Sequence, residues 1–390
     1  MRKRVQRLGH RLPKRSLSLV LLLLLCLAMC GCWDYRGLNK LIFVSGIAVD
    51  KNPETGDFIV TYEIMNLQGN IKQEGLSAKI VESTGRTIAE AVRNANRRVT
   101  YKLYFGHSTV LILSEEVAID GDLEELLDWV LRESEMRETA SIVISVGQPA
   151  GDLLKLVGLD QNVVANEIDK ILAEDSQTAS LTYHVEAFEA YNLLKAEGRS
   201  LALPVFHEAY NDGDMVAESN GVAVFKDTVM LGTLSPLESR MLLFMLNDIK
   251  GGLLICDIPE EKKHFSLLIS ESKTRLTYEE GEDGQLIFRV KIKMEARLSQ
   301  TDTYKNMLDA ATIERYERYA TGQLKADLET LVQRVQQEYD SDIFGLGNHI
   351  FDTNNRLWKK ISGDWDTLFQ NARVIVEPDI TVISTEYEKS

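Results

Sequence analysis

The pattern of apolar and polar positions in the first half of the chain mixes strand and helix periods. An apolar run at 41–49 and an alternating segment at 58–64 flank the turn-forming residues 52–57, which predicts a β-hairpin. Apolar residues at helical spacing over 87–99 precede a strand-like run at 108–113. Four further helical patterns and one β-branched run follow, at 123–132, 142–146, 150–157, 164–173 and 182–196.

The periodicity breaks between Gly198 and Gly221, where Pro204 and the turn-like residues 211–214 interrupt it. We expect the main domain boundary there, because proline, glycine and asparagine mark turns and loops. Beyond the break, residues 221–232 predict a second hairpin. It leads into a helix that begins at Pro236, a residue favoured in the first helical turn.

The last part of the chain predicts long elements. Two long strands are expected, of which the second alternates cleanly over 288–298. After Thr303 a helical stripe continues for more than thirty residues, with Gly322 as a candidate break. Two closing strands, 373–376 and 380–383, are separated by Pro378. Runs of strands and helices without strict alternation favour an α+β fold with several domains and mixed sheets, not a doubly wound sheet.

The first 32 residues have the features of a bacterial lipoprotein leader. Seven basic residues precede an apolar run at 17–29, which is shorter than the roughly 20 residues of a transmembrane helix. The run ends in Cys30-Gly31-Cys32, and only Cys32 follows a small residue, as lipoprotein processing requires. An uncleaved anchor with incidental cysteines is the alternative. The predicted attachment of a diacylglyceryl group to Cys32 would hold the protein stably on a membrane, because two acyl chains anchor far better than one.

These features define the expected organisation. We expect a signal peptide at 1–31 and an N-terminal α+β region at 32–215, which can contain two subdomains with a compact mixed unit near 75–150. A C-terminal α+β domain with a long hairpin and a long helix would occupy 216–390. A length of 390 residues with 44% hydrophobic and 26% charged residues is typical of such a multi-domain globular protein.

The net charge and the number of cysteines argue against nucleic-acid binding and against a fold held together by disulfide bonds. The net charge is −15, and removal of the seven basic leader residues from 44 would leave 37 Lys and Arg against 59 Asp and Glu, or −22. Such a body is poorly suited to nucleic acid, whose phosphates require basic partners. After the leader only Cys256 remains besides Cys32, so a disulfide framework is not expected.

No constellation of catalytic or metal-binding residues stands out in the sequence. The segment His207-Glu208 lacks the second histidine of a zincin helix, and Gly106-His107-Ser108 lacks the spacing of a nucleophile elbow. The acidic segment 279–284 departs from the EF-hand pattern and suits a hairpin tip. We therefore predict no catalytic residue, no cofactor and no metal, and we expect the protein not to be an enzyme.

One charged feature remains. Basic residues occupy one face of the alternating strand, at Arg289, Lys291, Lys293 and Arg297. Such a row is either a solvated strand face or a surface for an acidic partner.

Motifs distributed along the chain resemble the Ger(x)C family, the lipoprotein C subunits of spore germinant receptors. The resemblance starts at the sequence CWDYRGLN at Cys32 and continues through FVSGIAVD at 43–50. It extends over the body in the segments 103–107, 132–137, 221–227, 341–347 and 358–366. Gly37 stands where an acidic residue is usual in this family, and Asn354-Asn355 replaces a frequent proline.

The resemblance implies a non-catalytic subunit of a nutrient germinant receptor, active in spore germination. It implies a lipid anchor at Cys32 on the outer face of the spore inner membrane, and integral-membrane A and B type subunits as partners. The alternative is a lipid-anchored extracytoplasmic solute-binding protein. That class needs a deep cleft between similar lobes, and no internal duplication is visible in the sequence. An envelope hydrolase lacks a candidate nucleophile or metal site.

Overall fold

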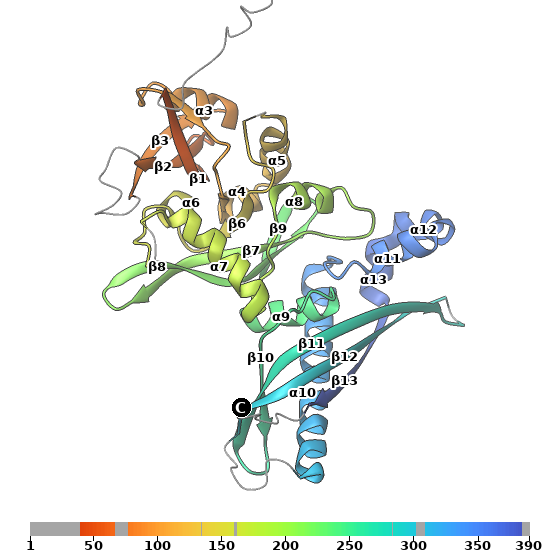
Figure 1. Ribbon diagram of the computed structural model, residues 1–390. Helices are drawn as coiled ribbons and strands as arrows, with labels where there is room; N and C mark the ends of the chain where they lie inside the picture. Colours follow the sequence, from red (N-terminus) through yellow and green to blue (C-terminus); the bar gives the residue numbers. More distant parts are fainter. Residues whose placement is uncertain are drawn as a thin grey trace, which may run out of the picture. The chain divides into compact units, whose positions relative to one another are not determined.

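The computed structural model describes residues 40–66, 77–133, 135–159, 162–282, 284–301 and 309–383. Within these residues the chain forms two β-sheets with helices packed on them (Figure 1). The first sheet has nine strands, in the order β3-β2-β1-β5-β6-β7-β8-β9, with β4 also beside β1. Its strands are β1 (Leu41–Lys51), β2 (Phe58–Asn66), β3 (Ser77–Gly85), β4 (Lys102–Tyr104), β5 (Val110–Ser114), β6 (Ser141–Ser145), β7 (Ala202–Asn211), β8 (Asp214–Lys226) and β9 (Val229–Leu234).

The centre of the first sheet is parallel and buried on both faces. β1, β5, β6 and β7 run parallel to one another, while the strands on both flanks pair antiparallel. All residues of β5 and β6 are buried, which explains their continuous apolar sequence. Helices of one face are α3 (Ile88–Ala95), α4 (Glu115–Ile119), α5 (Leu123–Arg132) and α8 (Ala187–Leu194), and those of the other are α6 (Ala150–Leu153) and α7 (Val164–Thr178).

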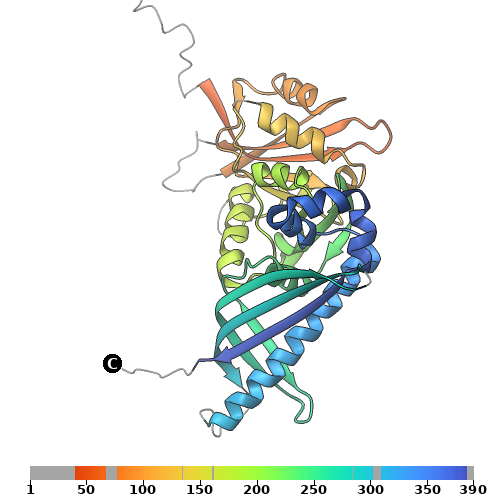
Figure 2. The same ribbon diagram turned by 90° about the vertical axis from the view of Figure 1, so that its right-hand side faces the viewer.

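The second sheet has four strands in the order β10-β11-β12-β13. They are β10 (Leu253–Ile258), β11 (Lys263–Glu280), β12 (Leu286–Thr301) and β13 (Arg373–Val382). β10, β11 and β12 are antiparallel neighbours, and β13 runs parallel to β12 (Figure 2). The alternation predicted over 288–298 is confirmed, because the apolar set from Phe288 to Ala296 is buried.

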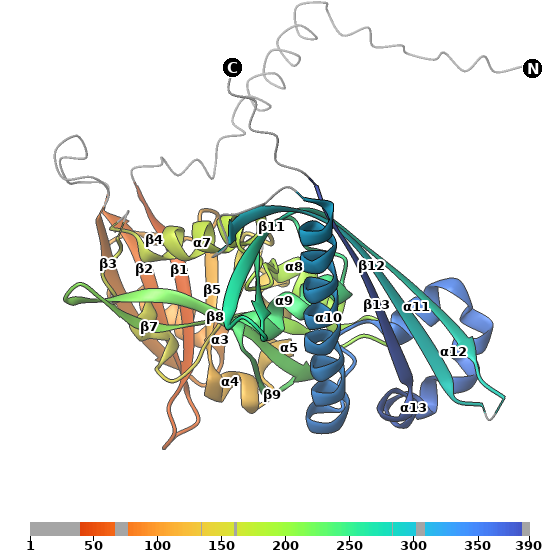
Figure 3. The same ribbon diagram turned by 90° about the horizontal axis from the view of Figure 1, so that it is seen from below.

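The long helix α10 (Ala310–Arg334) packs on the inner face of this sheet and continues into a π-helical turn, η2 (Val335–Tyr339). It contacts both edge strands, β10 and β13, so the sheet curves around it (Figure 3). The ring of Tyr316 stacks on Phe265 of β11 at 4.4 Å between centroids. Gly322 lies within the uninterrupted helix, so the break expected there is absent.

Helices between and beside the sheets complete a shared core. α9 (Pro236–Met245) buries one side against β8 and the other against the second sheet. Three short helices and a 3₁₀ turn precede β13: α11 (Leu346–Thr353), α12 (Asn355–Ile361), η3 (Ser362–Asp364) and α13 (Trp365–Asn371). The architecture is therefore a mixed α+β fold, as expected.

Two expected breaks are strands in the structure. The segment 198–221 was expected to be irregular, but β7 runs through Pro204 and pairs with both β6 and β8. The proline is tolerated because the register shifts between Pro204 and Phe206. The closing strands are one strand, β13, which contains Pro378 at the edge of its sheet, where a missing N–H is tolerated.

The expected boundary between residues 215 and 216 falls inside β8, and the first sheet continues to Leu234. The division of the chain into domains at that point stays a prediction.

Candidate functional site

Cys32, the predicted lipid-attachment residue, lies outside the described residues, as does the predicted signal peptide at 1–31. Among the described residues no helix is both long and apolar enough to span a membrane. The functional features that the structure describes belong to the body that follows Cys32.

A cavity with a volume of about 800 Å³ lies beside the C-terminal end of β1. It is lined by the hairpin turn after β1, by the start of α6 and by carboxylates from β3 and α4. Its two lysines are already paired. Lys51 contacts Asp120 at 2.9 Å and Asp122 at 2.6 Å, and Lys155 contacts Glu82 at 2.8 Å. Both positive charges of the cavity wall are thus neutralised by neighbouring carboxylates.

Asp50 at the wall of this cavity has a structural role. Its two carboxylate oxygens accept the backbone N–H groups of Ala150 at 2.6 Å and Gly151 at 2.8 Å, at the start of α6. Burial raises the pKa of Asp50, opposed by these two hydrogen bonds. A Cβ on Gly151 would lie 2.5 Å from Thr61 Oγ1, so glycine is needed for this approach. Both oxygens are engaged, so Asp50 has little capacity left for a ligand.

Glu63 of β2 repeats this arrangement at the start of α7. It is 1% exposed and accepts the N–H groups of Val164 at 2.7 Å and Ala165 at 3.1 Å, together with the hydroxyl of Ser45 at 2.7 Å. Burial raises its pKa as well, against the effect of these bonds. The β1–β2 hairpin thus positions two helices through carboxylates about a hundred residues away in sequence. Sequence reasoning missed both, although an acidic residue inside an otherwise apolar strand is a usable signal.

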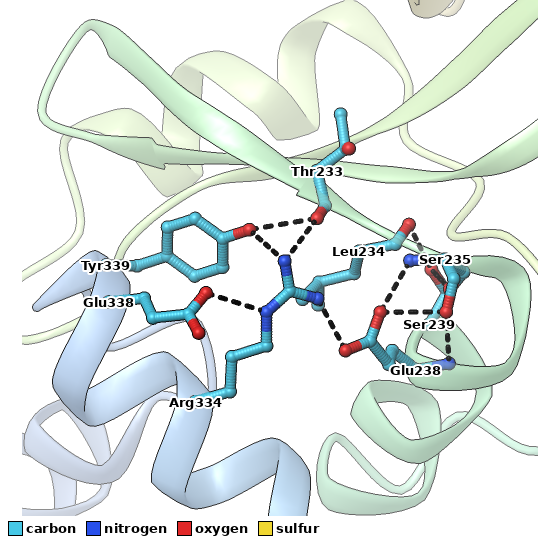
Figure 4. Close-up of polar contacts among 8 residues, drawn as sticks. All are labelled: Thr233, Leu234, Ser235, Glu238, Ser239, Arg334, Glu338 and Tyr339. Atoms are coloured by element: carbon cyan, nitrogen blue, oxygen red, sulfur yellow. Dashed lines mark hydrogen bonds and ion pairs between the residues drawn. The ribbon is translucent and has the colours of Figure 1, made fainter.

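A cluster around Arg334 connects α10 to the first sheet (Figure 4). The guanidinium contacts Glu238 of α9 at 2.5 Å and Glu338 at 2.9 Å. It also donates to Tyr339 Oη at 2.9 Å, and that hydroxyl donates to the carbonyl oxygen of Thr233 in β9 at 2.9 Å. Burial alone would raise the pKa of Glu238, but hydrogen bonds from Arg334 and Ser235 outweigh it and lower the pKa.

The segment 341–347, part of the family motif, is a second connection. The Ser341 hydroxyl donates to the Phe225 carbonyl of β8 at 2.5 Å. Asp342 accepts the N–H groups of Leu346 at 3.1 Å and Gly347 at 2.8 Å. Burial raises the pKa of Asp342 to about 6 despite these bonds. The motif therefore caps α11 and joins it to the first sheet.

The predicted basic row lies on the outer face of β12, away from α10. Arg289 pairs with Glu279 at 2.9 Å and with Glu377 at 3.5 Å, and Lys291 pairs with Glu377 at 3.5 Å. Neither Lys293 nor Arg297 has a salt bridge to a described residue. The register places two further basic residues of β11, Lys273 and Arg275, opposite Lys293 and Lys291. Sequence reasoning missed these two because strand register is not readable from one strand alone.

The histidines and the cysteine for which the sequence indicates no catalytic role occupy structural positions. His207 lies on β7, 3.9 Å from Glu218, and His107 packs against the rings of Phe43 and Tyr104. Cys256 is buried under α10, and burial raises the pKa of its thiol to about 12, which disfavours the reactive thiolate. No group of metal-ligating side chains occurs within the described ranges.

Ser141 and His184 form a contact that the sequence did not predict. Its geometry does not suit a catalytic serine. Ser141 Oγ lies 2.9 Å from His184 Nε2 and 2.7 Å from Asp169 Oδ1. The serine is 1% exposed, and its proton is directed to the carboxylate instead of being withdrawn by a base. The contact ties α7 and the segment just before α8 to β6.

Comparisons with known proteins cover both halves of the chain. The family model described as the spore germination protein N-terminal domain matches residues 34–208, and the one described as spore germination B3/GerAC like, C-terminal, matches residues 220–386. Spore germination protein KC of Bacillus subtilis (strain 168) is 22% identical over 90% of this chain and 91% of its own length. Protein B3 of the same organism is 24% identical, over 88% and 91%.

Spore germination protein GerQC of Bacillus cereus is 23% identical over 93% of this chain and 97% of its own length. The crystal structure of the GerBC protein superposes with a TM-score of 0.59 at 19% identity and covers 90% of this chain and 100% of that one. The fold is therefore shared along nearly the whole body. Together with the two family models, these likenesses identify the chain as a member of the Ger(x)C family of spore germination proteins.

Proposed function

We propose that the protein is a lipid-anchored, non-catalytic subunit of a nutrient germinant receptor. It would lie on the outer face of the spore inner membrane and act with integral-membrane A and B type subunits. The observation that carries this proposal is the match of family models to residues 34–208 and 220–386, which together contain most of both sheets. The relatives that align over about nine-tenths of this chain are named as spore germination proteins.

The anchor is proposed at Cys32. Gly31 before it has the small side chain that the processing peptidase needs, whereas Cys30 follows Met29. Two acyl chains on Cys32 would hold the body at a membrane without a spanning helix, at about 0.8 kcal/mol per buried CH₂. The first described strand begins at Leu41, nine residues after Cys32.

A non-catalytic role is supported by how the polar groups are used. The buried carboxylates Asp50, Glu63 and Asp342 accept backbone N–H groups at helix starts, which leaves them unsuited to acid–base chemistry on a substrate. Such groups are structural because a buried charge is stable only when its hydrogen bonds are satisfied.

The proposal is tested with Cys32→Ala, and Cys30→Ala serves as the matched control. In spores, Cys32→Ala is expected to abolish incorporation of labelled palmitate, to release the protein from the membrane fraction and to weaken nutrient-triggered germination. Cys30→Ala should leave all three unchanged. Labelling and membrane retention that persist in Cys32→Ala would overturn the anchoring site. Normal germination with the protein released would overturn the need for anchoring.

The alternative of a solute-binding protein would use the cavity beside β1. Its volume of about 800 Å³ lies within the usual size of small-molecule sites. Its lysines are already paired with carboxylates and Asp50 holds α6, so few polar groups remain to orient a ligand. Saturable binding of a nutrient by the full chain, removed by a substitution such as Glu116→Lys in the cavity wall, would support the alternative.

A further inference from the structure

The outer face of the second sheet carries a compact group of positive charges. Lys273 lies directly opposite Lys293, and Arg275 lies directly opposite Lys291, on the neighbouring strands β11 and β12. Side chains at directly opposite positions are separated by about 5 Å at Cβ. All four side chains are exposed, because α10 covers only the other face. These four residues are called the basic square.

One corner of the basic square has a salt bridge, and a second corner, Lys293, lies directly opposite the exposed Asp379 of β13. Lys291 pairs with Glu377 of β13 at 3.5 Å. For Lys273, Arg275 and Lys293 the described residues offer no salt bridge and no hydrogen bond from the side chain. Like charges directly opposite each other destabilise a sheet. Four such charges in two opposed pairs, on a chain with a net charge of −15, are a feature that folding alone does not require.

The same face of the sheet also carries an acidic pair beside the square and two exposed apolar residues further along the strands. Ile255 and Leu268, on β10 and β11, are 57% and 45% exposed. Glu271 and Glu295 form an opposed acidic pair next to Lys273 and Lys293. A uniformly anionic surface such as lipid headgroups would be repelled by that acidic pair. A short acidic protein segment, in contrast, can place its carboxylates beside the basic residues alone and use the apolar side chains as anchors.

The edges of the sheet are closed, which leaves the face as the accessible surface. At the β10 edge, Gln323 of α10 accepts the N–H of Asp257 at 3.1 Å and donates to the carbonyl oxygen of Ile255 at 3.0 Å. On β13, Glu317 of α10 accepts the N–H of Val382 at 2.8 Å, and Pro378 has no N–H. Addition of a partner strand at either edge is therefore blocked at these positions.

We propose that the outer face of β11 and β12 is a docking surface for an acidic segment of another protein. Its carboxylates would pair with Lys273, Arg275 and Lys293, and an apolar residue would pack on Ile255 and Leu268. Binding relieves the repulsion between the opposed basic pairs, so the complex is favoured by the same charges that disfavour the bare sheet. This surface does not depend on the receptor assignment or on the lipid anchor.

The test is site-specific photocrosslinking of the full-length chain in its own cells, with a photoreactive residue at Thr277, which is exposed on β11 beside Arg275. The charge-reversal variant Lys273→Glu/Lys293→Glu is compared with Lys79→Glu/Lys170→Glu. The control makes the same charge change at exposed positions outside the second sheet. Crosslinked peptides are identified by mass spectrometry, and thermal unfolding of each variant verifies that it is folded.

The expected result is a crosslink to an acidic peptide of a different protein, reduced about tenfold by Lys273→Glu/Lys293→Glu and unchanged in the control pair. Lysine substitutions of the crosslinked acidic residues in the partner should restore the yield with the charge-reversed variant. Crosslinks only to lipid or to a second copy of this chain would overturn the proposal. So would a yield that a folded charge-reversal variant leaves unchanged.

Discussion

Gly221, the first residue of the segment 221–227, shows how closely single residues are constrained. Its φ of +84° lies in the left-handed region that side chains disfavour, and a Cβ there would lie 2.1 Å from the carbonyl oxygen of Leu234. Its own carbonyl oxygen accepts the hydroxyl of Thr182 at 2.9 Å. Gly322 is the opposite case, because it is exposed within α10 and no atom lies within 4 Å of an added Cβ. One glycine is required by the fold, and the other only weakens a helix.

The prediction at this scale compares alanine at both positions. Gly221→Ala is expected to lower the free energy of unfolding by about 3 kcal/mol or more, because alanine is strained at this positive φ and its Cβ would clash with the carbonyl oxygen of Leu234. Gly322→Ala should raise it by roughly 0.5 to 1 kcal/mol, since alanine is the better helix former. Urea denaturation measures both. Equal effects of the two substitutions would contradict this explanation.

The helices differ in how their first turns are satisfied. α9 uses residues close in sequence: Ser235 accepts the N–H of Glu238, and the Glu238 side chain accepts the N–H of Ser235. In contrast, α6 and α7 receive their carboxylates from Asp50 and Glu63 in the β1–β2 hairpin. Local caps form with the helix, whereas distant caps form only when the sheet has folded. We therefore expect α6 and α7 to depend on the sheet for their stability.

Asp342, which accepts two N–H groups at the start of α11, is expected to make the stability of the protein depend on pH. Its pKa in the folded protein, about 6, lies above the ordinary value of 3.8, so its contribution to stability is present at low pH and is lost as pH rises toward 6. Relative to Asp342→Asn, which does not titrate, wild type should lose about 1.4 kcal/mol per pH unit between pH 4 and 6. Urea midpoints at pH 4, 5, 6 and 7 measure the difference.

The control for this experiment is Asp214→Asn, at the exposed first residue of β8. The substitution removes one exposed carboxylate and therefore controls for the loss of a negative charge from the chain. A difference between wild type and Asp342→Asn that stays constant with pH would show that the N–H partners stabilise the carboxylate at least as much as burial destabilises it, so that its pKa is not raised.

At the scale of the whole molecule, the two sheets are tied together by a few polar connections around a shared apolar core. Arg334 joins α10 to α9 and η2, Lys226 of β8 pairs with Asp340 at 2.6 Å, and Ser341 bonds the Phe225 carbonyl. The ring of Tyr339 also packs closely on Gly232, because a Cβ added to this glycine would lie 2.9 Å from the ring. These contacts bring together the residues just after α10 and the antiparallel end of the first sheet. We expect the two halves to unfold together.

A double-mutant cycle tests the Arg334 connection. Arg334→Ala and Glu238→Gln are each expected to destabilise the protein, with a coupling free energy of about 1 to 2 kcal/mol, because both side chains are only 30% exposed and the guanidinium engages four groups. The Lys325–Glu329 pair on α10 is half exposed and should show coupling below about 0.5 kcal/mol. A coupling in the Arg334 cycle no larger than in that pair would contradict the role of the cluster as a joint.

Many elements of the fold could be predicted from the sequence alone. The hairpins, the alternating strand over 288–298, the long helix, the α+β class and the family resemblance all rest on local patterns, which survive in one dimension. Two breaks placed at Pro204 and Pro378 were wrong, because an edge position or a register shift can accommodate proline inside a strand. Whether a proline ends a strand depends on its neighbours in the sheet.

The remaining features depend on the tertiary structure and could not be predicted from the sequence. The caps from Asp50 and Glu63 join residues about a hundred positions apart, and the basic square exists only because the β11–β12 register places Lys273 opposite Lys293. Local sequence determines which faces are apolar and where turns form, since those depend on a few adjacent residues. Partners across the chain depend on register and on packing, which form only when distant segments meet.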